Sequence, residues 1–77
     1  MPKPGELVQL ISPRGKRYLK RVMAPGEPNS QALHTSDGVI TQEQLMEADF
    51  GGHVTSHLGR HYRLLKPTLY DLVKGVK

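Results

Sequence analysis

Hydrophobic and polar residues alternate over short stretches along most of this 77-residue chain. Runs of apolar and β-branched residues are separated by clusters of Gly, Pro, Asn, Asp and Ser, a pattern typical of short strands joined by turns. The expected strands cover residues 6–12, 16–22, 31–35, 39–40, 53–56 and 60–65. We therefore expect about five or six short strands.

The first two expected strands flank the sequence "PRG", which predicts a hairpin. Pro13 presets φ for the second turn position, and Gly15 supplies the positive φ of a bulged turn. Alternation along the second strand directs Lys16, Tyr18 and Lys20 to one side, and the intervening Arg17, Leu19 and Arg21 to the other. Since neither side is purely apolar, we expect this strand near a sheet edge or only partly covered.

Two short helices are predicted from their first residues. "TQEQ" is a capping box, in which Thr41 accepts from the amide of Gln44 and the Gln44 side chain reaches back, and it predicts a helix over 41–48. Thr68 and Asp71 form a similar start for a second helix. Its apolar residues recur at i, i+3, i+4 and i+7, which gives one stripe: Leu69, Leu72, Val73 and Val76.

These elements predict a mainly β fold: a small β-barrel or rolled antiparallel sheet of about five or six strands with two short helices. We expect residues 1–66 to form the β domain. We expect residues 67–77 to begin a helical connector whose apolar stripe exceeds what so small a domain can cover.

Charge adds a functional hint, because the net charge of +4 is unevenly distributed. Residues 13–22 and 60–66 hold basic side chains without an acid, whereas Lys and Arg are absent from the acidic stretch 27–49. Two basic blocks favour a surface that binds a polyanion such as RNA. Tyr18 and Tyr62 lie among these cations, where they either stack on unpaired bases or pack in the core.

The sequence carries no recognisable catalytic motif. His53, His57 and His61 recur at four-residue spacing, but a strand-turn-strand context makes a metal site unfavourable, and we expect none. The chain has no Cys, no apolar run of membrane-spanning length and no signal-peptide pattern at Met1, so we expect a cytoplasmic protein without membrane contact.

Three stretches resemble the N-terminal domain of the tRNA (adenine-N1) methyltransferases that modify the T-loop adenosine at position 58 of tRNA. They are "PRGKRYLKRV" (13–22), "HTSDGVIT" (34–41) and "HVTSHLGRHYRLLKPTLYDLV" (53–73). The last is the most specific, with a strand, a Leu-Gly turn, a second strand and Pro-Thr-Leu opening a helix. The resemblance extends from about Gly5 to Val76.

This resemblance implies a non-catalytic domain that helps to position the tRNA T-arm and precedes a catalytic domain of the same chain. It implies S-adenosylmethionine as the cofactor of the full-length enzyme, with no cofactor in residues 1–77, and a homotetrameric assembly. The RNA-contacting residues that it implies are Ser12, Pro13, Arg14, Lys16, Arg17, His34, Thr35, Ser36, Asp37, Gly38, Arg60, His61 and Arg63. A free-standing protein-interaction module and a general RNA-binding β-barrel are the alternatives.

Overall fold

The structure, a computed structural model, describes residues 1–24, 26–28 and 30–74. Its strands and helices are β1 (Leu7–Ile11), β2 (Arg17–Arg21), β3 (Leu33–Thr35), β4 (Gly38–Ile40), α1 (Gln42–Glu47), β5 (His53–Thr55), β6 (His61–Leu65) and α2 (Leu69–Lys74). The expectation of a mainly β fold with about five or six short strands and two short helices is confirmed, with six strands.

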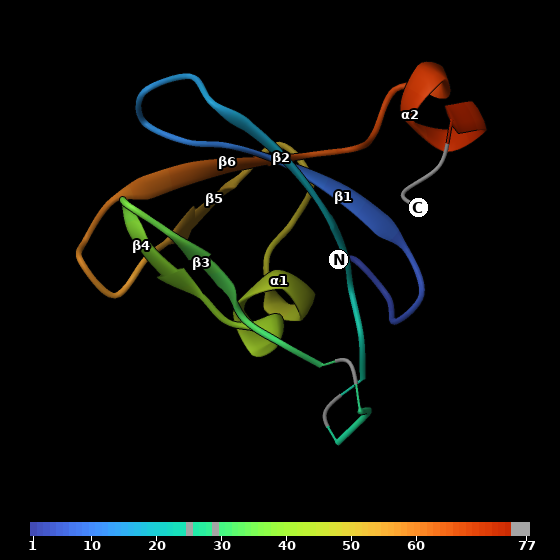
Figure 1. The fold of residues 1–77 in the computed structure, drawn as a ribbon, viewed down its shortest axis with the longest axis horizontal. Coiled ribbons are helices and arrows are strands. Elements are labelled where there is room, and N and C mark those ends of the chain that lie inside the picture. Colours follow the sequence, from blue (N-terminus) through green and yellow to red (C-terminus); the bar gives the residue numbers. More distant parts are fainter. Residues whose placement is uncertain (25, 29, 75–77) are drawn as a thin grey trace.

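The strands form two antiparallel sheets (Figure 1). The larger sheet has the order β2-β1-β6-β5, so that β1 lies between its sequence neighbour and a strand from the far end of the chain. β3 and β4 form a separate two-stranded sheet. Over the described residues no strand pairing joins the two sheets into a closed barrel, so this part of the sequence-based expectation is not found.

One face of the larger sheet carries the core. Alternate residues of each strand point to this face, and the β3–β4 hairpin and α1 lie on that side of the sheet (Figure 1). Burial of a large apolar side chain stabilises a fold by about 1.5–3 kcal/mol. The fully buried apolar side chains are Val8, Leu10, Val22, Ile40, Leu45, Tyr62 and Leu64. They form one cluster that holds the two sheets and α1 together.

The edge position expected for the second strand is confirmed, since β2 pairs with β1 and with no other strand among the described residues. The outer face of the larger sheet is mixed: Arg17 and Arg21 are exposed, whereas Leu7 and Gln9 of β1 are buried. The Gln9 side-chain amide donates to the carbonyl of Lys66 at 3.3 Å. The chain segment that leads into α2 therefore crosses this face and covers part of it.

Both helices begin as their sequences predict. Thr41 caps α1, and its reciprocal bonds with Gln44 form the expected capping box. At α2, the Thr68 amide donates to the Asp71 carboxylate at 2.9 Å, and the Asp71 amide donates to the Thr68 hydroxyl at 3.1 Å. Val76, the last residue of the predicted stripe, lies outside the described residues. Neither described helix has the length and apolar character needed to cross a bilayer.

At Gly38, the first residue of β4, the chain packs tightly against Ser56, which directly follows β5. Gly38 has φ +118° and is buried, and a Cβ at this position would lie 2.5 Å from the Ser56 hydroxyl oxygen and 2.7 Å from the Ser56 Cβ. Both contacts are too short for any side chain. Glycine is therefore required here for its backbone conformation and for the close approach.

We expect Gly38→Ala to lower the free energy of unfolding by about 2–4 kcal/mol, because strain at positive φ adds to the clash with Ser56. Gly59→Ala is a matched control: Gly59 also has positive φ, at +82°, but has open space around it. The control should lose only about 1 kcal/mol. Urea unfolding of both variants measures the difference, and equal losses would show that the contact between the sheets is unimportant.

Candidate nucleic-acid interface

Two loops of the larger sheet share one sequence pattern, Ser-x-x-Gly followed by Lys or Arg. Residues 12–16 join β1 to β2, and residues 56–60 join β5 to β6. In the first loop the Ser12 amide donates to the Lys16 carbonyl at 2.8 Å, and the Lys16 amide donates to the Ser12 hydroxyl at 3.0 Å. The Gly15 amide donates to the Ser12 carbonyl at 2.9 Å.

The second loop repeats this set of bonds. The Ser56 amide donates to the Arg60 carbonyl at 2.8 Å, the Arg60 amide donates to the Ser56 hydroxyl at 3.2 Å, and the Gly59 amide donates to the Ser56 carbonyl at 2.9 Å. In both loops the serine is buried. The glycine lies in the left-handed region, with φ +84° at Gly15 and +82° at Gly59. Each loop thus holds an exposed cation, Lys16 or Arg60, at the same position.

The turn between β3 and β4 lies against both loops. The Ser56 hydroxyl donates to the Asp37 carbonyl at 2.6 Å, and the Val39 amide donates to His57 Nδ1 at 2.9 Å. The Asp37 carboxylate lies 3.4 Å from Arg14 Nε. Three turns that are far apart in the sequence therefore meet at one end of the molecule, on the left in Figure 1.

The predicted contact residues divide into two groups by burial. The buried group, Ser12, Asp37 and Gly38, shapes the turns through its side chains or backbone. Thr35 is partly buried and is counted with this group, because its hydroxyl makes a short contact with the Tyr62 hydroxyl. The exposed residues are Pro13, Arg14, Lys16, Arg17, His34, Ser36, Arg60, His61 and Arg63. The exposed group is strongly basic, as a phosphate-binding surface requires.

The two tyrosines have packing roles. Tyr62 is fully buried, so it is a core residue and is not available to stack on a base. Tyr18 is partly buried, with its ring centroid 6.3 Å from that of Tyr62, and Lys16 Nζ lies 5.4 Å from the Tyr18 ring centroid. Of the two sequence-based alternatives, the structure therefore favours packing.

Sequence reasoning missed the structural roles of Ser56 and His57, which tie the second loop to β4. The signal was present in the recurrence of Ser-x-x-Gly-cation in "SPRGK" and "SHLGR". Two loops with identical glycine and serine positions in a short chain indicate the same turn geometry. The pattern also places Leu58, which is 56% exposed, at the position that corresponds to Arg14.

Arg17 makes a second, different interaction. Its Nη1 atom lies 2.9 Å from both carboxylate oxygens of Asp71 in α2, 54 positions away. The hydrogen bond from Arg17, followed by the hydrogen bond from the Thr68 amide, holds the pKa of Asp71 below its ordinary value of 3.8, although burial acts in the opposite direction. Arg17 is therefore engaged with α2 and does not lie free beside the loops.

In the described part of the chain, no group of three or more His, Asp or Glu side chains is placed to hold a metal ion. His53 and His61 are neighbours on β5 and β6, with ring centroids 6.1 Å apart, while His57 bonds to β4. Neither described helix begins at a glycine-rich turn after a parallel strand, the arrangement that binds nucleotide cofactors in doubly wound folds.

Comparison with known proteins gives two informative matches. The chain is 31% identical over 68 residues to tRNA (adenine(57)-N(1)/adenine(58)-N(1))-methyltransferase TrmI of Methanocaldococcus jannaschii. The aligned stretch covers 88% of this chain and 21% of that protein. The fold of this chain matches the crystal structure of a SAM-dependent O-methyltransferase from Thermotoga maritima with a TM-score of 0.79 and 25% sequence identity. That match covers 95% of this chain and 26% of the other chain. No family model matches the chain.

The fold therefore defines a small β domain of the kind that occurs within SAM-dependent methyltransferases. Within that class, the resemblance to the tRNA (adenine-N1) methyltransferases predicted from the sequence is confirmed, and the match is consistent with an N-terminal domain of such an enzyme. The chain spans about one fifth of the length of the curated relative and about one quarter of the structural one.

We expect the Asp71 carboxyl to titrate with a midpoint below 3.8. Because the pKa is lower in the folded state than in the unfolded chain, the stabilisation is complete above pH 3.8 and is lost as the pH falls through the lowered value. NMR titration of the Asp71 carboxyl carbon measures the midpoint. Arg17→Ala should move this midpoint upward. An unchanged midpoint in Arg17→Ala would show that the hydrogen bond from Arg17 does not lower the pKa of Asp71.

Proposed function

We propose that this chain is the tRNA-contacting domain of a cytoplasmic, S-adenosylmethionine-dependent tRNA (adenine-N1) methyltransferase, and that it is not catalytic by itself. The observation that carries the proposal is the convergence of three turns, with matched cations on two of them. The sequence relationship to a tRNA (adenine-N1) methyltransferase supports tRNA as the polyanion. In this proposal the domain helps to position the T-arm, and the methyl transfer takes place in another part of the protein.

The proposed contacts are electrostatic. Lys16 and Arg60 are exposed at equivalent loop positions, and each backbone is fixed by three hydrogen bonds. Cations on rigid loops neutralise phosphates without a large loss of backbone entropy. Arg14, with its side chain 71% exposed, adds a third cation, partly balanced by Asp37. The exposed His34, Ser36, His61 and Arg63 extend this surface, while the buried Ser12, Asp37 and Gly38 act by shaping it.

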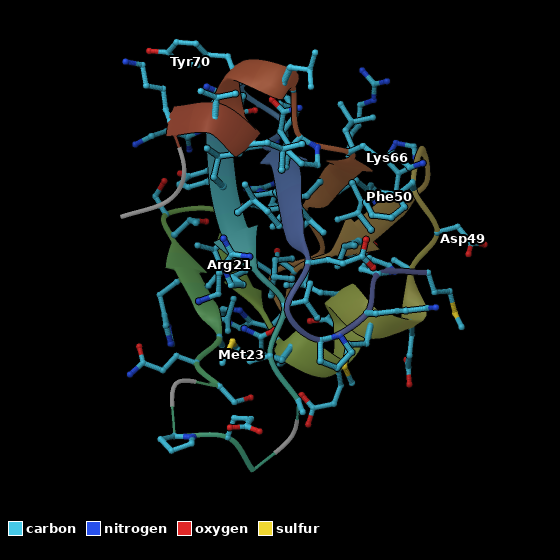
Figure 2. All side chains as sticks on the ribbon, turned by 90° about the vertical axis from the view of Figure 1, so that its right-hand side faces the viewer. Arg21, Met23, Asp49, Phe50, Lys66 and Tyr70 are labelled. Carbon is cyan, nitrogen blue, oxygen red and sulfur yellow. The ribbon has the colours of Figure 1, made fainter. Side chains whose placement is uncertain are left out.

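The opposite side of the molecule fits a protein neighbour. α2 exposes Leu69, Tyr70, Leu72 and Val73, by 80%, 66%, 56% and 81% respectively. In Figure 2 the Tyr70 side chain projects outward from the helix. An open groove of about 380 Å³ lies beside α2, with Leu7, Phe50 and Leu72 among its lining residues.

We propose that the catalytic domain of the same chain, which carries S-adenosylmethionine, covers this apolar surface, and that residues 67–77 form the connector within a homotetrameric enzyme. The alternative of a free-standing protein-interaction module rests on the same exposed helix. It leaves the cationic turns without a role, so the methyltransferase proposal accounts for more of the structure.

We expect the chain to bind tRNA weakly, with a log-log dependence of affinity on salt of about −2 to −4 if three to five phosphates are contacted. Lys16→Glu combined with Arg60→Glu should weaken binding by roughly tenfold or more and reduce the slope by about one and a half. These residues are preferred to Arg14, because replacing Arg14 would also leave the buried Asp37 without its partner. Fluorescence anisotropy with labelled tRNA at several salt concentrations measures both quantities.

Lys3→Glu combined with Lys74→Glu is the matched control, since both double variants bring the net charge from +4 to zero. Lys3 and Lys74 are exposed and lie outside the three turns. The control should bind much more tightly than the loop variant. Equal weakening in the two double variants would mean that only total charge matters, and the turns would lose their assigned role.

A further inference from the structure

We propose that Arg17 is a positioning residue that clamps α2 to the loop-bearing hairpin through Asp71, and so fixes the direction of the connector relative to the three turns. This positioning role differs from the RNA contact that the family resemblance implies for Arg17. The clamp itself can be tested independently of RNA. Its consequence for the placement of a catalytic domain rests on the proposed function.

Apolar packing contributes little to holding α2 in place. The four large apolar side chains of the helix, Leu69, Tyr70, Leu72 and Val73, are all more than half exposed. The only residue of α2 that is buried is the charged Asp71, at 3% exposure. A helix of six residues is too short to be stable by itself in water. Its position must therefore depend on polar contacts.

The Asp71 carboxylate is fully engaged by such contacts. It accepts two contacts of 2.9 Å from Arg17 Nη1 and a third of 2.9 Å from the Thr68 amide. Charge-assisted hydrogen bonds are roughly twice as strong as neutral ones. One carboxylate thus completes the cap of the helix and also attaches the helix to β2. Removing Arg17 would leave the cap but not the attachment.

Arg17 is placed so that this attachment reaches the predicted RNA-contacting turns. It is the first residue of β2, immediately after the loop of residues 12–16, and it pairs with Ile11 across the hairpin. The connector is held a second time where Gln9 donates to the Lys66 carbonyl. Both polar contacts join α2 and its lead-in segment to the β1–β2 hairpin. The geometry therefore couples the orientation of α2 to one of the two matched loops.

Amide hydrogen exchange on the 77-residue chain tests the clamp. The Leu72 amide reports on α2, since it donates to the Thr68 carbonyl at 3.1 Å. At neutral pH we expect Arg17→Ala to raise its exchange rate on the order of tenfold. Asp71→Asn should have a similar effect, and the Arg17→Ala/Asp71→Asn double variant should add little, because either single change breaks the same interaction.

Arg63→Ala is the matched control. Arg63 is an exposed arginine on the same face of the sheet, and it pairs with Ile11 from the other side. Its removal should change Leu72 exchange by less than twofold. Additive effects of the two clamp substitutions, or no faster exchange in Arg17→Ala, would overturn the proposal.

A tRNA titration separates positioning from RNA contact. Arg17→Ala should keep the affinity for tRNA within about twofold of the wild-type value. Lys16→Ala should weaken the affinity by more than this. A loss in Arg17→Ala as large as that in Lys16→Ala would show that Arg17 binds RNA directly and would overturn the positioning role. If the wild-type chain does not bind tRNA at all, the proposed function fails, while the exchange experiment still decides whether the clamp exists.

Discussion

The Ser56 hydroxyl joins the two sheets at the end where the three turns meet. It donates to the Asp37 carbonyl of the β3–β4 turn and accepts from the Arg60 amide of its own loop. These bonds require the chain at Gly38 to approach within a distance that excludes any side chain. The contact that holds the β3–β4 turn against the end of β5 thus also fixes the loop that carries Arg60. Stability and the proposed interface therefore depend on one small group of buried residues.

The other side of the domain follows a different physical rule. The larger sheet and α1 are held by a buried apolar cluster, whereas α2 leaves its apolar residues in solvent and buries a carboxylate. An isolated domain gains little from such an arrangement, since exposed leucines add no packing energy. It becomes favourable when a neighbour covers the apolar residues and the polar clamp has already fixed the helix. In our proposal the domain therefore has an RNA-facing side and a protein-facing side. The β1–β2 hairpin connects the two sides.

The elements were predictable from the sequence because their signals are local. The capping boxes at Thr41 and Thr68 and the positive-φ Gly15 each depend on residues within one turn. The arrangement of the strands in two sheets was not predictable, because the pairing of β1 with β6 joins residues more than 50 positions apart. A closed barrel and a pair of sheets have the same alternation along each strand.

The candidate interface shows the same limit. The turns were predicted, together with their exposed cations Arg14, Lys16 and Arg60, from charge and from a family resemblance. What sequence reasoning did not supply was the division between residues that are exposed and residues that shape the turns, such as Asp37, and the engagement of Arg17 by Asp71. Both depend on contacts between distant segments. The repeated Ser-x-x-Gly-cation loop was within reach of sequence reasoning, because identical local patterns form identical turns.

The most direct test of the central claim is an NMR map of tRNA binding to the chain, with amide chemical shifts followed as tRNA is added at low salt. The account predicts that the largest shifts fall on the loops of residues 12–16 and 56–60 and on the turn at Ser36 and Asp37. Amides of α2 and of the groove beside it should change little. Large shifts on α2 with unchanged loops would contradict the account, since RNA would then occupy the surface that we assign to a protein neighbour.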